Sequence, residues 1–225
     1  LNGTKSVVLN AASADVILIS ARTEGQATDA HGISLFLVPG DTEGLSRKDY
    51  PTVDGLRASE VLLDNVRVPA SALVGAEGAA SQTLNTVINR GILAISAEAV
   101  GAMAVLYQST IDYTKQRVQF DHPLSEFQVV KHRLTEMFIE YNLAKSLCMK
   151  ATMLLNQNSG DAQRHIHALK FLIGKTSRFV GQNAVQLHGG MGMTEDLAIA
   201  HYFKRLMMID ATFGHTDIHL DAFVQ

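Results

Sequence analysis

The stretch GAEGAASQTLNTVINRGILAISAEAVGAMAVL, residues 75–106, decides the fold of this 225-residue chain. From Gly78 onward its apolar residues recur every three or four positions, the spacing that places side chains along one face of an α-helix. This face comprises Leu84, Val87, Ile88, Ile92, Ile95, Ala99, Met103 and Leu106. The spacing predicts a long helix that buries one stripe of side chains in a core.

The residues before this helix have the pattern of β-strands. Short apolar or β-branched runs are separated by clusters of Gly, Asp, Asn, Thr and Pro, which are typical of turns. The runs are Ser6–Leu9, Asp15–Ser20, Ile33–Pro39 and Ser59–Pro69. They predict a small antiparallel sheet or barrel over residues 1–75. The change of period, between Gly75 and Gly78, predicts the domain boundary.

Three more helices are expected after residue 106. One carries an apolar stripe from Phe127 to Leu154, and a second runs from about Asp161 to Leu187. The last runs from about Glu195 to Met208, with Thr194 as its N-cap. Helices of this length with short loops are typical of an antiparallel bundle. The predicted fold class is therefore α+β, with a partial β domain over residues 1–75 and a four-helix bundle over residues 76–225.

Composition argues against several kinds of partner. The 19 basic and 22 acidic residues are spread along the chain, so there is no basic stripe for nucleic acid and no polybasic segment for a membrane surface. No uninterrupted apolar run reaches the roughly 20 residues of a membrane-spanning helix. The single cysteine, Cys148, cannot form an intrachain disulfide. We expect a cytoplasmic location, no nucleic-acid partner and no membrane insertion.

The sequence QLHGGMGMTED, Gln186–Asp196, interrupts the helical pattern with three glycines. It is not a P-loop, because no Gly-Lys-Ser/Thr follows, and not a dinucleotide fingerprint, because a helix rather than a strand precedes it. A helix C-cap needs only one glycine in the left-handed conformation. Two adjacent glycines would also let a planar ligand or a pyrophosphate approach the backbone amides. A cap and a cofactor site are both open at this point.

A second candidate site is KQRVQFDHPLSEFQ, Lys115–Gln128, at the junction of two helices. Arg117 offers a planar fork for a phosphate pair, and Phe120 offers a ring face on which a base can stack. The alternative is a surface arginine beside an ordinary core phenylalanine.

Histidines form the third candidate. His215 and His219 are four residues apart with Asp217 between them, and His165 and His167 are two apart. If this C-terminal segment is helical, His215 and His219 share one face. No third ligand stands in a recognisable motif, so no metal site is expected.

Five segments together resemble the middle and C-terminal regions of the acyl-CoA dehydrogenases, in that order and at similar spacing. They are LNGTKSVVLNAASADVILISAR at residues 1–22, GISLFLVP at 32–39, GLRASEVLLDNVRVPASALVGAEG at 55–78, RVQFDHPLSEFQ at 117–128 and QLHGGMGMTED at 186–196. The resemblance implies a flavoprotein with a β domain followed by a four-helix bundle. It also implies that the family's N-terminal helical domain lies before Leu1.

The resemblance implies roles for individual residues. Arg117 and Phe120, with Gln128 in the same motif, match the residues that hold the pyrophosphate and adenine side of FAD in a neighbouring subunit. The residues that match the lining of the same adenosine arm are Gln186, Gly189 and Gly190. Sites shared in this way imply a homo- or hetero-tetramer. The implied reaction, in fatty acid metabolism, is α,β-desaturation of an acyl-CoA thioester, with electrons passing from FAD to an electron-transfer flavoprotein.

The chain departs from the family where the catalytic base is expected. Most members place a glutamate where this chain has Phe213, and a minority place the base where it has Asn89. The neighbouring Arg90 matches a residue on the substrate side. Three nearby carboxylates are candidate substitutes, namely Asp210, Asp217 and Glu98. Three further departures are Val7 and Leu9, near the expected flavin ring, and Asp121, which replaces a common glycine.

Three functions therefore stay open. The first is an FAD-dependent acyl-CoA dehydrogenase whose base is still to be identified. The segments HYFKRLMMIDATFG at residues 201–214 and IHL at 218–220 resemble the small subunit of pimeloyl-CoA-type dehydrogenases, in which two different chains associate. The second function is thus a non-catalytic partner subunit of a heterotetramer that contributes FAD contacts only. The third is a flavin oxidase or monooxygenase of the same superfamily.

Overall fold

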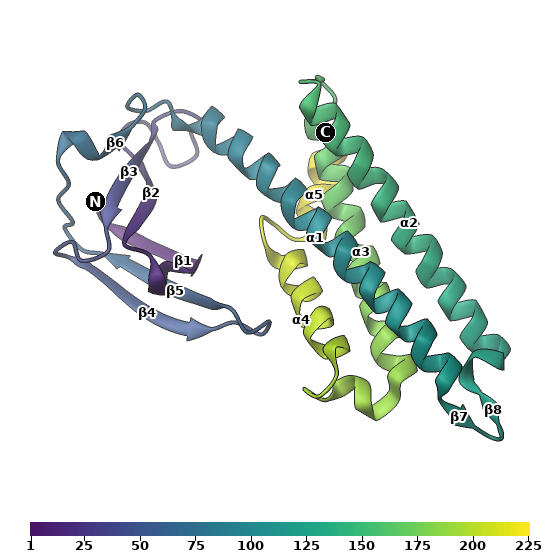
Figure 1. The fold of residues 1–225 in the computed structure, drawn as a ribbon. Coiled ribbons are helices and arrows are strands. Elements are labelled where there is room, and N and C mark those ends of the chain that lie inside the picture. The colour runs from purple at the N-terminus through teal and green to yellow at the C-terminus, as the bar shows by residue number, and fades with distance from the viewer. The chain divides into compact units, whose positions relative to one another are not determined.

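A computed structural model describes residues 1–225, which divide into two compact units, Leu1–Val87 and Ile88–Gln225. The first unit contains the β-strands, except for one short hairpin, and the second is helical (Figure 1). The predicted combination of antiparallel sheets and packed helices is confirmed.

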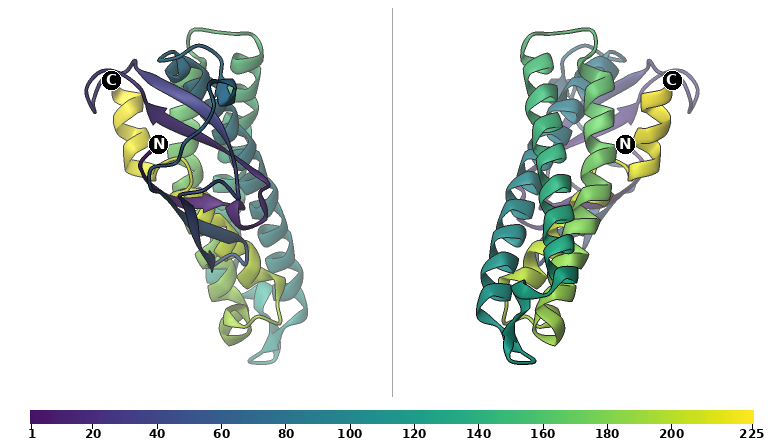
Figure 2. Two further views of the ribbon diagram at one scale, coloured as in Figure 1. Left: turned by 90° about the vertical axis from the view of Figure 1, so that its left-hand side faces the viewer. Right: turned by 90° about the vertical axis from the view of Figure 1, so that its right-hand side faces the viewer.

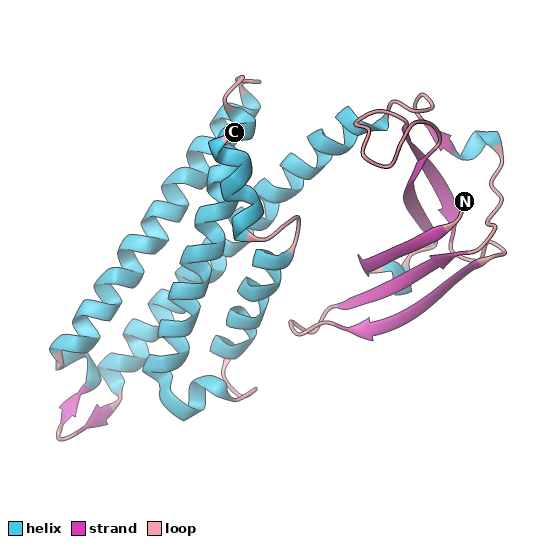
Figure 3. Cartoon of the chain, turned by 180° about the vertical axis from the view of Figure 1, so that it is seen from behind, coloured by secondary structure: helices cyan, strands magenta, loops and turns pink.

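The N-terminal unit is built from two three-stranded antiparallel sheets (Figure 3). In the first sheet β5 (Arg57–Leu63) lies between β1 (Gly3–Leu9) and β4 (Leu45–Pro51), and in the second β3 (Ile33–Pro39) lies between β2 (Val16–Arg22) and β6 (Leu73–Val74). The alternation of apolar and polar residues directs one face inward, where Ile17, Ile19, Val38, Val61 and Leu63 form a core. This packing accounts for the β-branched runs of the sequence.

Two strand predictions need correction. The strand expected over Ser59–Pro69 ends at Leu63. A strand that was not expected, β4, has the sequence LSRKDYP, which is mostly polar because it pairs with β5 on one side only and most of its side chains are exposed. Edge strands of this kind carry little apolar signal.

The helical unit is a bundle of long antiparallel helices. Its elements are α1 (Ala80–Gln116), which begins in the first unit, α2 (Gln128–Asn156), α3 (Ala162–His188), α4 (Ala198–Ala211) and α5 (Thr216–Val224). The central helix is α3, which packs against α2, α4 and α5 and runs beside α2 in both views of Figure 2. Buried residues from all the long helices form one core.

The C-terminal part differs from the sequence prediction in two places. Thr194 is not the N-cap of α4, because the chain first forms a short 3₁₀ helix, Gly189–Met193, and α4 begins only at Ala198. The Thr194 hydroxyl instead donates a hydrogen bond to the carbonyl of Met191. The chain forms an additional helix, α5, and His215 is its N-cap rather than a helical residue. His215 and His219 therefore do not share a helix face.

Helix α1 contains an 18-residue segment with a mean hydropathy of 1.4, apolar and long enough for a membrane-spanning helix. Ile92, Ala99, Met103 and Leu106 of α1 are instead buried in the core of the bundle. Packing within the chain therefore accounts for part of the hydropathy of this helix, since 39% of the segment is buried.

Candidate functional site

The junction of α1 and α2 is a tight hairpin that presents Phe120 to solvent. Strands β7 (Val118–Gln119) and β8 (His122–Pro123) are joined by Phe120 and Asp121, which both have positive φ, +55° and +65°. A two-residue hairpin loop needs this left-handed conformation at both central positions. Phe120 is therefore directed outward, is 85% exposed, and contacts Phe127 edge-on at a centroid distance of 6.2 Å. Its ring face is available for stacking.

Arg117 lies at the base of the same hairpin. Its backbone N–H continues the helical pattern to the carbonyl of Tyr113, and its carbonyl accepts a hydrogen bond from Leu124 N–H. The side chain is exposed and makes no hydrogen bond or ion pair within the chain. An unpaired guanidinium beside an exposed ring is suited to an anionic, planar ligand.

The glycine turn after α3 contains glycines of different kinds. Gly189 has φ of +62° and is the C-cap of α3, with its N–H bonded to the carbonyl of Gln186. A Cβ at Gly192 would lie 2.6 Å from the carbonyl oxygen of Val185, so packing requires that glycine. A Cβ at Gly189 or Gly190 would have no atom within 4 Å. The chain's own packing therefore does not explain Gly190, and a ligand that lies against this backbone would.

A ring contact joins the hairpin to the glycine turn. Tyr113, one turn before Arg117, stacks on His188 with ring centroids 4.3 Å apart and donates a 3.4 Å hydrogen bond to its carbonyl. His188 immediately precedes Gly189. The structure therefore brings the two motifs to the same end of the bundle, as Figure 1 shows. An exposed cation, an exposed ring and an open glycine backbone together fit the adenosine diphosphate part of FAD.

Two glutamines lie close to these motifs. Gln128 begins α2, Gln186 lies in the last turn of α3, and both are exposed. Between the two helices is an open cavity of about 730 Å³, lined by Gln128, Val129, His132, Arg133, Glu136, Phe179, Gln182 and Asn183. Within it Arg133 donates a 2.7 Å hydrogen bond to Asn183. Gln128 thus lines a polar groove between α2 and α3.

One of the two positions that the resemblance matches to the family's base, Phe213, packs on the helix that carries the other, Asn89, although not on Asn89 itself. Phe213 lies in the loop between α4 and α5 with φ of +59°, and a Cβ at Gly91 would be only 2.8 Å from its Cζ. The aromatic ring therefore lies on α1 at Gly91, two residues after Asn89. Arg90, between them, is exposed. The place where a carboxylate is expected holds an aromatic ring and an amide.

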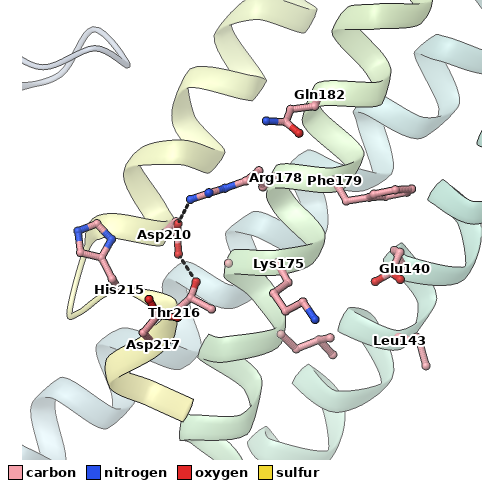
Figure 4. Close-up of a pocket in the computed structure, with 12 residues that line it drawn as sticks. Glu140, Leu143, Lys175, Arg178, Phe179, Gln182, Asp210, His215, Thr216 and Asp217 are labelled. Carbon is pink, nitrogen blue, oxygen red and sulfur yellow. Dashed lines mark hydrogen bonds and ion pairs between the residues drawn. The ribbon is translucent and has the colours of Figure 1, made fainter. Parts of the chain in front are cut away.

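The candidate substitute carboxylates are occupied or lie elsewhere. Asp210 is buried and accepts hydrogen bonds from Arg178 at 3.1 Å and from Thr216 at 2.8 Å (Figure 4). Glu98 is paired with Arg205 at 2.5 Å. Asp217 lines a different cavity, of about 650 Å³, whose wall contains neither Phe213 nor Gly91. None of the three is positioned as a replacement for the missing base.

Sequence reasoning missed a buried cluster beneath the Phe213 loop. Lys170 of α3 is fully buried and donates hydrogen bonds to the carbonyls of Asp210 and Gly214, and His167 of α3 contacts His219 of α5. These residues are about 50 positions apart, so no local motif signals them. A lysine in the apolar stripe of a helix is the one indication that the sequence offers.

Comparison with known proteins agrees with this arrangement. Residues 1–66 match the family model described as acyl-CoA dehydrogenase, middle domain, and residues 70–225 match acyl-CoA dehydrogenase, C-terminal domain. The chain belongs to the acyl-CoA dehydrogenase family.

Individual relatives cover the whole chain. It is 30% identical over 221 residues to the probable acyl-CoA dehydrogenase YngJ of Bacillus subtilis, covering 97% of this chain and 58% of YngJ. The acyl-CoA dehydrogenase structure from Geobacillus kaustophilus superposes with a TM-score of 0.92 at 28% identity, over 99% of this chain and 60% of that one. The FAD complex of PigA superposes with a TM-score of 0.93 at 28% identity, over 100% of this chain and 59% of the PigA chain. The acyl-CoA dehydrogenase homology thus spans somewhat more than half of each relative.

The homology places the chain among flavoenzymes. The structure shows where the residues that differ from the family pattern lie. Val7, which replaces a family aromatic residue, lies at a β-bulge of β1 with φ of +53° and is 53% exposed. Leu9 is also exposed. By contrast, Asp121 adopts the left-handed conformation in which the family commonly has glycine. The resemblance matches Val7, Leu9 and Phe213 to positions near the flavin ring or the base, where this chain differs from the family, whereas Arg117, Phe120, Gly189 and Gly190 agree with the pattern matched to the adenosine side.

Proposed function

We propose that this chain is part of an FAD-dependent acyl-CoA dehydrogenase that desaturates an acyl-CoA thioester and passes electrons to an electron-transfer flavoprotein. The observation that carries the proposal is the common location of Arg117, Phe120 and the open glycines Gly189 and Gly190 at one end of the bundle. The complex of the related PigA with FAD supports the choice of cofactor.

The chain's own residues would bind the cofactor rather than react with it. Arg117 would form charge-assisted hydrogen bonds to the pyrophosphate, and Phe120 would stack on the adenine. Gln186 and Gln128 would add hydrogen bonds, and Gly190 would leave the backbone open to the adenosine arm. FAD supplies the two-electron redox chemistry when bound. Since these groups point away from the bundle core, we propose that they serve the FAD of a neighbouring subunit in a tetramer.

Replacement of Arg117 tests this role. A charge-assisted hydrogen bond is worth about 1.5–3 kcal/mol, so Arg117→Ala should weaken FAD binding by about 10- to 100-fold, measured by flavin fluorescence titration of the apoprotein. Arg47→Ala is the control, because Arg47 is an arginine of the N-terminal unit that lies on β4 and bonds the carbonyl of Ala11. Equal FAD affinity of Arg117→Ala and the parent would contradict the proposal.

The absence of a base favours a second candidate, in which this chain is the non-catalytic partner of a heterotetramer. Phe213 covers Gly91, and Asn89 cannot take the α-proton of the substrate. In that case the base comes from a different chain, and this chain supplies FAD contacts only. Co-purification distinguishes the candidates, because a stable homotetramer with full desaturase activity would exclude the second.

A further inference from the structure

Two buried side chains, Lys170 and His219, hold the backbone of the loop that carries Phe213. Lys170 Nζ donates to the carbonyls of Asp210 at 2.8 Å and Gly214 at 2.9 Å, and His219 Nε2 lies 2.9 Å from the carbonyl oxygen of Phe213. His167 Nδ1 lies 2.9 Å from His219 Nδ1. We call Lys170, His167 and His219 the loop clasp.

The hydrogen bonds assign the proton positions of the two histidines. A carbonyl only accepts, so His219 must carry a proton on Nε2 to bond Phe213. In neutral His219 the other nitrogen, Nδ1, is then an acceptor, and His167 must donate to it from its own Nδ1. One added proton on His219 Nδ1 can be accommodated, because a neutral His167 that carries its own proton on Nε2 accepts at Nδ1. Only when both histidines are protonated do two donors face each other. The contact between the histidines therefore requires that at least one of them is neutral.

The charged groups around the clasp favour this state. Burial lowers the pKa of His219, and the neighbouring Lys170 and His167 lower it further, although the bond to the Phe213 carbonyl opposes this. Burial also lowers the pKa of His167. It lowers the pKa of Lys170 to about 8, with Asp210 acting in the opposite direction. From α3 and α4 the ion pair of Arg178 with Asp210 faces the same loop.

The loop clasp holds Phe213 and Gly214 in a backbone conformation that is strained for phenylalanine. Phe213 and Gly214 have φ of +59° and +102°, and the left-handed conformation is uncommon for a phenylalanine. Close packing beneath the loop is possible because residue 174 is glycine, where a Cβ would be 2.3 Å from Asp210 Oδ1. With both carbonyls held, the side chain at position 213 is directed onto Gly91 of α1.

We propose that Lys170 and His219 are positioning residues, which fix the carbonyls of Gly214 and Phe213 so that the side chain at position 213 lies over Gly91 in the acyl site. Their assignment to the acyl site rests on the proposed function, whereas the positioning itself does not. In this chain the clasp presents an aromatic wall to the acyl group. The same backbone would present a base if residue 213 carried a carboxylate.

The test places 3-fluorophenylalanine at position 213 of the complete protein and follows its ¹⁹F signal with pH. In the parent we expect one signal above about pH 7, shifting toward that of a solvent-exposed fluorophenylalanine at pH values far enough below the ordinary histidine pKa of about 6.5 that His167 and His219 are both protonated and repel each other. His219→Gln keeps an N–H donor for the Phe213 carbonyl but does not titrate, so its signal should match the parent above pH 7 and stay constant below it. His219→Leu should give the exposed signal at every pH.

Two further variants serve as controls. His215→Gln removes an exposed histidine of the same loop whose side chain makes no hydrogen bond, and should leave the pH profile unchanged. Lys170→Met should shift the signal as His219→Leu does, without depending on the histidines. If Lys170→Met or His219→Leu fails to fold, the comparison of the parent with His219→Gln still decides.

The proposal is overturned if His219→Gln behaves like His219→Leu, or if the parent signal does not change with pH. The ¹⁹F signal needs neither flavin nor substrate. An intact clasp in a protein that shows no acyl-CoA chemistry would therefore contradict the proposed function alone. If the protein is an active dehydrogenase but its ¹⁹F signal is the same in all these variants, the positioning role of the clasp alone is contradicted.

Discussion

The hairpin and glycine turn at one end of the bundle contrast with the loop between α4 and α5. At the first, Phe120 is exposed, the exposed Arg117 guanidinium makes no hydrogen bond or ion pair within the chain, and a Cβ at Gly190 would meet no atom within 4 Å. At the second, the backbone is held by buried donors, yet the side chain at position 213 is apolar. Under the proposed function, the first region carries side chains suited to binding the cofactor, whereas the second holds a backbone position that carries no group able to remove a proton.

The largest expected effect on this difference between the two regions is a gain in reaction rate when a carboxylate is introduced at position 213. Because the clasp holds the backbone at position 213, Phe213→Glu should place a carboxylate over Gly91. A positioned general base contributes about 10²- to 10⁴-fold in rate, so flavin reduction by acyl-CoA should rise by about that factor in a stopped-flow measurement. Phe213→Gln, of the same size but without a base, is the matched control. An equal rate for the two variants would show that position 213 does not serve as the base site.

The glycine turn can be dissected with a pair of alanine substitutions. Gly192→Ala places a Cβ against the carbonyl of Val185, and overpacking of this kind costs about 1–3 kcal/mol of the free energy of unfolding. Gly190→Ala meets no atom within 4 Å and should change that free energy by less than about 0.5 kcal/mol. FAD affinity should nonetheless fall in Gly190→Ala. Urea denaturation and flavin titration of both variants measure the two effects. Unchanged FAD affinity in Gly190→Ala would remove the turn from the cofactor site.

The smallest expected effect is the pH dependence of stability. His167 and His219 have lowered pKa values in the folded chain, so the unfolded chain binds protons more readily. Their contribution to stability is complete above the unfolded pKa of about 6.5 and is lost as the pH falls through that value toward the folded pKa values. Urea midpoints should be lower at pH 5.5 than at pH 7.5. In His219→Gln the difference should be smaller, whereas in His215→Gln it should equal that of the parent.

Much of the fold could be predicted where side-chain burial repeats with a regular period. The spacing of apolar residues predicted the long helices to within a few residues, and the run Ile33–Pro39 coincides with β3. Prediction failed where burial is one-sided or local signals compete. The polar edge strand β4 gave no alternation, and Thr194, a good capping residue, bonds Met191 in a 3₁₀ turn instead of starting α4.

The site divides in the same way. Arg117, Phe120 and the glycine pair stand in short segments whose residue types allow a phosphate and an aromatic base, and the family resemblance of those segments made them the candidate cofactor site from the sequence by itself. The loop clasp is different, because Lys170, His167 and His219 belong to helices far apart in the sequence. The role of a buried lysine or a histidine pair can be assigned only when its hydrogen-bond partners are known. When the partners are about 50 residues apart in the sequence, the packing of the helices determines which residues they are. The sequence resemblance pointed to position 213, but only the tertiary structure showed that Lys170 and His219 hold the backbone there and that the Phe213 ring lies on Gly91.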